Sequence, residues 1–252
     1  MRDATRDSVT SGAPAAPLGA RGGGAERTGP VGGRPLAGSP RTLVAILAVA
    51  LVVYAAIAAD VVEGGRLSSL DDDLSRWVAS SMPAVAEWMA RVLSWIGGWV
   101  GVTLIVALVV AWLVRRGEGG LGVLLIVVAL GGQLLNSVTK SGYDRPRPTA
   151  GSPVELPSST SFPSGHAMSG IVVFGLLGLL LARELPARNG RLAAIAAGFV
   201  FGALIGASRV VLNVHFFTDV LGGAALGLAW LAACLLVWGL VAARRRRYAE
   251  PS

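Results

Sequence analysis

Six long apolar blocks without a single charged residue constrain this chain more than any other feature. They cover Leu43–Ala59, Ile96–Val114, Leu121–Thr139, Ala167–Ala182, Leu192–Ala207 and Val220–Ala243. About 20 apolar residues in a helix cross the hydrocarbon core of a bilayer, and flanking residues extend the shorter blocks to that length. Of the 252 residues, 53% are hydrophobic and only 15% are charged, which excludes an ordinary soluble domain. The sequence therefore predicts an all-α, polytopic membrane protein with a six-helix transmembrane bundle.

Composition divides the chain into three regions. Residues 1–40 are rich in Gly, Ala, Pro and Arg and lack a periodic apolar pattern, so we expect a disordered cytoplasmic tail. Residues 41–243 contain the six blocks and form the predicted membrane domain, and residues 244–252 form a basic cytoplasmic tail. Because the first block begins only after residue 42, we interpret it as a retained span rather than a secretory signal.

The distribution of arginine predicts the orientation. Arginines gather in both tails and in the loops after the second and fourth blocks, at Arg115, Arg116, Arg183, Arg188 and Arg191. Positively charged loops stay cytoplasmic, so the net charge of +7 reports membrane orientation rather than a nucleic-acid partner. By the parity of six spans, residues 60–95, 140–164 and 208–217 then lie on the extracytoplasmic side.

The first extracytoplasmic segment contains two further patterns. Residues 85–96 repeat apolar residues at helical spacing, which predicts an interfacial helix on the extracytoplasmic side. We expect this helix to pack on the bundle; the alternative is that it lines a route for a lipid. We interpret Asp71, Asp72 and Asp73 as charges near a helix start, with a cation site as the alternative.

Three short polar clusters interrupt the apolar sequence on this side. They contain the only lysine of the chain, Lys140, and its two histidines, His166 and His215. Arg147 follows Lys140 in an extended, proline-rich stretch, and Arg209 begins the third cluster. A guanidinium offers a planar fork of donors that matches phosphate oxygens, and an ammonium adds a compact charge. Three cations that converge in this way predict a phosphate site.

The residues around the histidines suit anion binding and nucleophilic chemistry. Ser164 and Gly165 precede the fourth block, where the free N–H groups of a helix start bind anions. A plain helix cap is the alternative for Ser164. His215 and Asp219 are four residues apart and would share a helix face. A carboxylate on one imidazole nitrogen fixes the tautomer and leaves the other nitrogen free as a nucleophile.

Two alternative interpretations concern the same clusters. We interpret Arg145 as a solvated anchor at a helix end. Two histidines and an aspartate could also ligate zinc, but three nearby cations would repel a divalent ion. The sequence therefore favours a site without a metal.

Together the clusters resemble the signature of the type 2 phosphatidic acid phosphatase (PAP2) superfamily. Its motifs are Lys-x6-Arg-Pro, Pro-Ser-Gly-His and Ser-Arg-x5-His-x3-Asp. They are met by Lys140, Arg147 and Pro148, by Pro163 to His166, and by Ser208, Arg209, His215 and Asp219. The resemblance covers roughly residues 96–243.

The resemblance implies a role for each residue. His215 would be the nucleophile that forms a phosphohistidine, Asp219 would orient it, and His166 would protonate the leaving oxygen. The phosphoryl oxygens would be bound by Lys140, Arg147, Ser164, Gly165 and Arg209. The family needs no metal or other cofactor.

The same resemblance implies an integral-membrane lipid phosphatase that acts at the extracytoplasmic face. Its substrate would be undecaprenyl diphosphate, phosphatidic acid or phosphatidylglycerol phosphate, and its partners a membrane lipid and the bilayer. A lipid- or glycan-directed phosphotransferase would use the same residues, and the sequence does not separate the two. A non-enzymatic transporter or structural protein is less favoured, because the spans lack intramembrane ionisable groups. The sequence leaves the oligomeric state open.

Overall fold

The fold is described by a computed structural model that covers residue 36 and residues 38–249, with side chains through residue 245. Its helices are α1 (Pro40–Glu63), α2 (Arg66–Ser81), α3 (Ala84–Gly97), α4 (Trp99–Arg115), α5 (Gly119–Lys140), α6 (Gly165–Ser169), α7 (Gly175–Glu184), α8 (Arg188–Val211) and α9 (Phe217–Ala249). A π-helical turn, η1 (Gly170–Phe174), joins α6 to α7. Within these residues no strand occurs, and the predicted all-α class is confirmed. Nearly all of the predicted N-terminal tail lies outside the described residues.

Each predicted span corresponds to a helical segment. The helices α1, α5, α8 and α9 and the continuous segment Gly165–Glu184 are long and apolar enough to cross a membrane. The pair α3 and α4 meets the same test together but is bent by 53°. The bend lies at Gly98, whose extended backbone (φ −73°, ψ 169°) interrupts the helix. The multi-pass membrane fold is therefore confirmed, with the second span as a bent pair.

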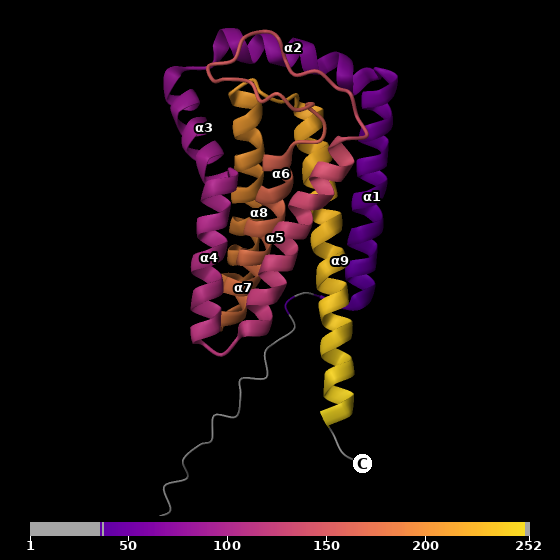
Figure 1. Cartoon of the computed structure of the whole chain (residues 1–252), viewed down its shortest axis with the longest axis vertical. Coiled ribbons are helices and arrows are strands. Elements are labelled where there is room, and N and C mark those ends of the chain that lie inside the picture. The colour runs from indigo at the N-terminus through magenta and orange to yellow at the C-terminus, as the bar shows by residue number, and fades with distance from the viewer. Residues whose placement is uncertain (1–35, 37, 250–252) are drawn as a thin grey trace, which may run out of the picture. The chain divides into compact units, whose positions relative to one another are not determined.

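Local signals in the sequence set the turn from α1 into α2. Ser39 caps α1 by accepting a hydrogen bond from the Thr42 amide at 3.2 Å, and Gly64 ends the helix in the left-handed region at φ 64°. Asp60, in the last turn of α1, then accepts the Ser68 amide at 2.8 Å. This carboxylate caps the first turn of α2, which lies across the ends of the other helices (Figure 1).

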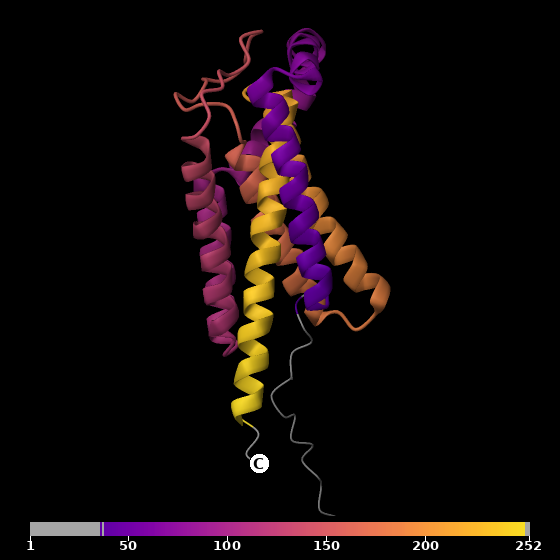
Figure 2. The same ribbon diagram turned by 90° about the vertical axis from the view of Figure 1, so that its right-hand side faces the viewer.

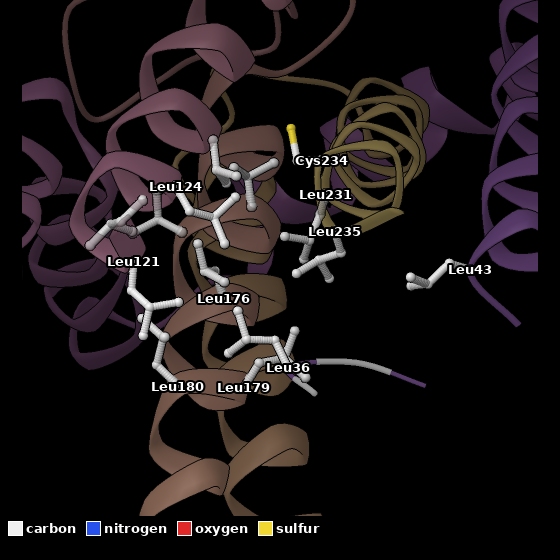
Figure 3. Packing of buried hydrophobic residues seen from close by; sticks show 14 of the residues in the cluster. Leu36, Leu43, Leu121, Leu124, Leu176, Leu179, Leu180, Leu231, Cys234 and Leu235 are labelled. Carbon is white, nitrogen blue, oxygen red and sulfur yellow. The ribbon is translucent and has the colours of Figure 1, made fainter. Parts of the chain in front are cut away.

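The longer helices pack side by side in a bundle. Helix α1 runs along α9, α4 pairs with α5, and both α3 and α7 pack against α8 (Figures 1 and 2). Leucines of α5, α7 and α9 meet in the core near Cys234, as Figure 3 shows for Leu121, Leu176 and Leu231. Large apolar side chains on the outer faces, such as Leu108 and Leu130, are exposed, as expected for a surface in contact with lipid.

A close approach between α8 and the fourth span brings two polar clusters together. A methyl group added to Gly202 would lie 2.5 Å from the carbonyl oxygen of Gly170, so only glycine fits there. Gly198 meets Gly178 in the same way one turn further along. Small residues allow helix backbones to approach closely in membranes. The contact holds Arg209, at the end of α8, near the first turn of α6.

Two elements differ from the sequence-based expectations. The predicted helix at residues 85–96 forms as α3 and packs on the bundle beside α8, as expected, with Gly97 directly against Ile205. The helix that lies across the bundle end, however, is α2 (Figure 1). Helix α9 continues to Ala249 rather than ending at residue 243. Arginine is a good helix former, and no Gly or Pro lies between residue 243 and Pro251.

Candidate active site

The three polar clusters meet in a cavity of about 770 Å³ at the end of the bundle. They are carried there by the long loop after α5 and by the turn between α8 and α9. Among the residues that line the cavity are Lys140, Arg147, Gly165, His166, Arg209 and His215. Ser164 and Asp219 lie fully buried beside them. The structure thus brings together all eight residues that the sequence singled out, at one end of the spans as parity predicted.

His215 is held in a defined orientation by its neighbours. Its Nδ1 lies 3.3 Å from Asp219 Oδ2 and 3.4 Å from Ser161 Oγ. Its Nε2 lies 3.2 Å from Arg147 Nη1, which can only donate, so Nε2 is the acceptor and Nδ1 carries the proton. Burial lowers the pKa of His215 to about 4, with Asp219 opposing that shift. The side chain is therefore neutral at pH 7, with a lone pair on Nε2.

Both oxygens of Asp219 accept hydrogen bonds. Oδ2 faces His215 and accepts hydrogen bonds from the Phe216 amide at 2.9 Å and from the Ser161 hydroxyl. Oδ1 accepts from Arg145 Nη1 at 2.6 Å. These hydrogen bonds hold the carboxylate against the imidazole.

The loop after α5 fixes Arg147 through its own carbonyl groups. Arg147 Nε donates to the carbonyl of Ser159 at 2.9 Å and to that of Pro157 at 3.1 Å, and Nη1 donates to Val214 at 2.6 Å. Burial lowers the pKa of Arg147, but a guanidinium stays charged at physiological pH. Its charge therefore stands next to the Nε2 atom of the neutral imidazole.

Three buried polar atoms have no hydrogen-bond partner among the described residues, and all belong to this site. They are Ser164 Oγ, Arg209 Nε and Asn136 Nδ2. Asn136 and Arg209 line the cavity, and Ser164 directly precedes Gly165 at its wall. Leaving a buried donor without a partner costs about 1–3 kcal/mol, more for a charged group. A bound anion with several acceptor oxygens would remove this cost.

Ser164 does not cap the helix that follows it. It occupies the position before α6, yet its side chain makes no capping hydrogen bond, so the interpretation as a plain cap is wrong. The hydroxyl has no hydrogen-bond partner among the described residues. A methyl group on Gly165 would lie 3.0 Å from Asn136 Oδ1, so glycine keeps this wall of the cavity open. His166 follows in the first turn and lines the same cavity.

Arg145 and Asp71 lie beside the candidate site, where the sequence interpretation did not place them. Arg145 is not a solvated anchor, because its side chain is only 12% exposed and pairs with Asp219 and with Asp71 Oδ2 at 2.7 Å. Asp71 lies within α2 rather than at its start, and Arg145 occupies the position that a cation would take. Asp71 is buried on the same face of α2 as Ser75 and Val78. The helical spacing of these three residues is the signal in the sequence that could have placed Asp71 on the inner face.

A comparison with known protein families matches the part of the chain that contains these residues. A family model for the PAP2 superfamily matches residues 121–242. Residues 121–242 belong to the PAP2 superfamily. All eight candidate site residues fall within the matched segment, which confirms the resemblance inferred from the motifs.

A sequence match and a structure match extend this assignment. The chain is 43% identical over 109 residues to phosphatidylglycerophosphatase B of Bacillus subtilis (strain 168), over 42% of this chain and 53% of the relative. The chain therefore spans about half the length of that curated relative. A crystal structure of a transmembrane PAP2 type phosphatidylglycerolphosphate phosphatase from Bacillus subtilis is 29% identical and has the same fold, with a TM-score of 0.65. It matches 77% of this chain and 93% of its own.

Proposed function

We propose that this protein is a membrane phosphatase that removes the terminal phosphate of a lipid phosphate through a phosphohistidine at His215. The observation that carries the proposal is the pair of unpartnered donors, Ser164 Oγ and Arg209 Nε, beside a neutral histidine whose Nε2 acts as an acceptor. A phosphate group supplies the acceptor oxygens that both donors lack. Lys140 and Arg147 add positive charge around the same space.

The reaction takes place in two steps. Nε2 of His215 attacks the phosphorus while the bond from phosphorus to the lipid oxygen breaks, and His166 gives that oxygen its proton. Water then attacks the phosphorus, His166 takes up a proton from it, and the bond between phosphorus and Nε2 breaks. Free phosphate leaves and His215 returns to its neutral form. Asp219 holds the proton on Nδ1 and stabilises the positive charge that develops on the ring.

Phosphatidylglycerophosphate is the substrate that we favour. The curated sequence and the crystal structure from Bacillus subtilis that match this chain are both named for that activity. The cavity, at about 770 Å³, is large enough for a phosphorylated headgroup, and it opens at the end of the spans, where headgroups lie. Phosphatidic acid and undecaprenyl diphosphate present the same terminal phosphate.

The test is phosphate release by the purified full chain in detergent. Phosphatidylglycerophosphate, phosphatidic acid and undecaprenyl diphosphate are compared with and without a chelator. We expect activity that survives the chelator and is lost in His215→Ala, while Arg76→Ala, at an exposed pair with Asp73, keeps it. Retained activity in His215→Ala would remove the nucleophile, and loss with the chelator would restore the metal alternative. A phosphotransferase would release phosphate poorly until an acceptor alcohol is added.

We also propose that both termini are cytoplasmic and that the cavity opens on the extracytoplasmic side. The support is the arginine-rich loops at the opposite end of the bundle, where Arg116 pairs with Glu184 at 2.9 Å. Single cysteines at exposed Ser158 and Asn189, with Cys234 replaced by alanine, test this in intact cells. A reagent that does not cross the membrane should label the first and spare the second. The reverse pattern would overturn the orientation.

A further inference from the structure

Arg145 connects the site to helix α2 through two buried carboxylates. Nη1 donates to Asp219 Oδ1 at 2.6 Å, and Nη2 donates to Asp71 Oδ2 at 2.7 Å. Thr218 completes the group: its hydroxyl accepts from Arg145 at 2.6 Å and donates to Asp71, and its amide donates to Asp71 Oδ1 at 3.1 Å. The guanidinium also lies 4.5 Å from the centre of the Phe216 ring. Arg145 is thereby held in one position by three neighbouring residues and an aromatic face.

Burial makes this arrangement expensive to break. The side chains of Asp71 and Asp219 are 1% and 0% exposed, and each would be an uncompensated buried charge without Arg145. We propose that Arg145 is a positioning residue, and that the clamp formed by Asp71, Arg145 and Asp219 orients the carboxylate of Asp219 and balances its charge. The inference rests on the proposed function, because it concerns the orientation of the same nucleophile.

The clamp divides the two oxygens of Asp219 between two tasks. Oδ1 faces Arg145, whereas Oδ2 faces the imidazole, the Ser161 hydroxyl and the Phe216 amide. A carboxylate that lost its partner at Oδ1 could rotate, and its full charge would act on the ring. The first effect disturbs the alignment of His215, and the second favours the imidazolium form, which cannot attack phosphorus.

The sign of the charge effect follows from the groups around His215. Arg147 and Lys140 oppose its protonation, as does His166 when charged, and Asp219 favours it. Arg209 adds a cation from α8 at the same cavity, and Asp71 adds a second carboxylate behind Arg145. Removing Arg145 takes away a cation and frees the charge of Asp219, so both changes favour the protonated ring. Removing the charge of Asp71 acts in the opposite direction.

The experiment compares Arg145→Met, Arg145→Lys, Asp71→Asn and Arg91→Met in the full-length protein in detergent. Arg91 is the matched control, because it also anchors the loop after α5, through the Pro153 carbonyl at 2.7 Å, but does not contact Asp219. Phosphate release from phosphatidylglycerophosphate gives kcat and KM between pH 4 and 9. Thermal unfolding verifies that each variant is folded.

For Arg145→Met we expect kcat to fall about 10²-fold with little change in KM, because alignment rather than binding is lost. The acid limb of kcat/KM should move up by about one pH unit or more. Arg145→Lys should restore part of both, while Arg91→Met should leave the limb in place. Asp71→Asn should leave the limb unchanged or move it to lower pH.

Each contrary outcome identifies what is wrong. A limb that does not move in Arg145→Met, or that moves equally in Arg91→Met, would show that Arg145 only anchors the loop. A rise in KM alone would make it a phosphate ligand instead. An upward shift in Asp71→Asn would overturn the charge balance, even where Arg145→Met fails to fold. Lack of activity in the unaltered protein would instead count against the proposed function.

Discussion

Replacing Asp219 by asparagine tests the orientation of the nucleophile most directly. The substitution keeps the size of the side chain but turns one of two acceptor oxygens into an NH2 group. Both oxygens face donors: Arg145 at Oδ1, and the Phe216 amide and Ser161 hydroxyl at Oδ2. The new NH2 must therefore face a donor in either orientation of the amide. The orientation with the lower free-energy cost decides the activity.

The energies favour the orientation that inactivates the enzyme. An NH2 beside Arg145 would leave a buried guanidinium short of an acceptor, and breaking such a pair costs about 3–5 kcal/mol. The cost falls below that range here, because Asp71 still pairs with Arg145. An NH2 at the Oδ2 position strands the Phe216 amide, at about 1–3 kcal/mol, while the Ser161 hydroxyl can turn and accept. Arg147 Nη1 also loses the imidazole as an acceptor but keeps the Val214 carbonyl. The NH2 then donates to His215 Nδ1 and moves the ring proton to Nε2.

A histidine with its proton on Nε2 has no lone pair for phosphorus. The loss of the correct tautomer costs about 10⁴-fold in kcat in a comparable histidine–aspartate pair, or about 5 kcal/mol of barrier. We therefore expect a drop of about that size in Asp219→Asn, with KM nearly unchanged because the phosphate ligands remain.

Single-turnover phosphate release and a KM titration measure the two quantities. The control is Ser161→Ala, which removes one donor to the carboxylate but leaves the tautomer intact, and we expect about tenfold at most. If Asp219→Asn keeps its kcat within about tenfold of the unaltered protein while remaining folded, the assigned tautomer and the argument from donors are refuted.

Further predictions address stability and binding. The pKa of His215 is lowered from 6.5 to about 4, so between these pH values the unfolded chain takes up a proton that the folded chain does not. The temperature at the midpoint of unfolding should therefore decrease as the pH is lowered from 6.5 to about 4. Gly202→Ala should destabilise the fold by about 1–3 kcal/mol, because its methyl group would meet the carbonyl of Gly170, whereas Gly239→Ala, in open space, should stabilise by up to about 1 kcal/mol. Thermal unfolding in detergent compares the two, and equal midpoints would contradict the close packing. Arg209→Lys should raise KM for the lipid phosphate about tenfold, because lysine lacks the fork and the Nε donor; an unchanged KM would remove Arg209 from the phosphate ligands.

The sequence predicted the parts of this fold that depend on continuous stretches of chain. Uncharged apolar runs long enough to cross a bilayer allow only helices, since every backbone group must be paired within the segment. Parity then brought the three polar clusters to one end without any knowledge of packing. The spacings within each cluster match the motifs of one family, and that match predicted a role for each residue.

What the sequence missed depends on contacts between distant elements. Apart from their spacing from Lys140, nothing local distinguishes Arg145 from Arg147, since both are followed by proline in the same extended stretch. Only the packing of α2 over the site brings Asp71 to Arg145, at a separation of 74 residues. Ser164 was ambiguous for the same reason: its position predicts a cap, and only the three-dimensional structure shows that the hydroxyl makes no such bond.

The two arginines of the Arg-Pro-Arg-Pro stretch act at opposite ends of the pair formed by His215 and Asp219. Arg145 pairs with the carboxylate, and Arg147 lies 3.2 Å from Nε2, where the phosphate would bind. Within residues 38–245, Lys140, Arg147 and Arg209 have no carboxylate within ion-pair distance, so their charge is available for phosphate. The charge of Asp219 acts on Lys140 and Arg147, and its pairing with Arg145 balances part of that charge. One arginine paired with the carboxylates therefore leaves the other cations free for the phosphate.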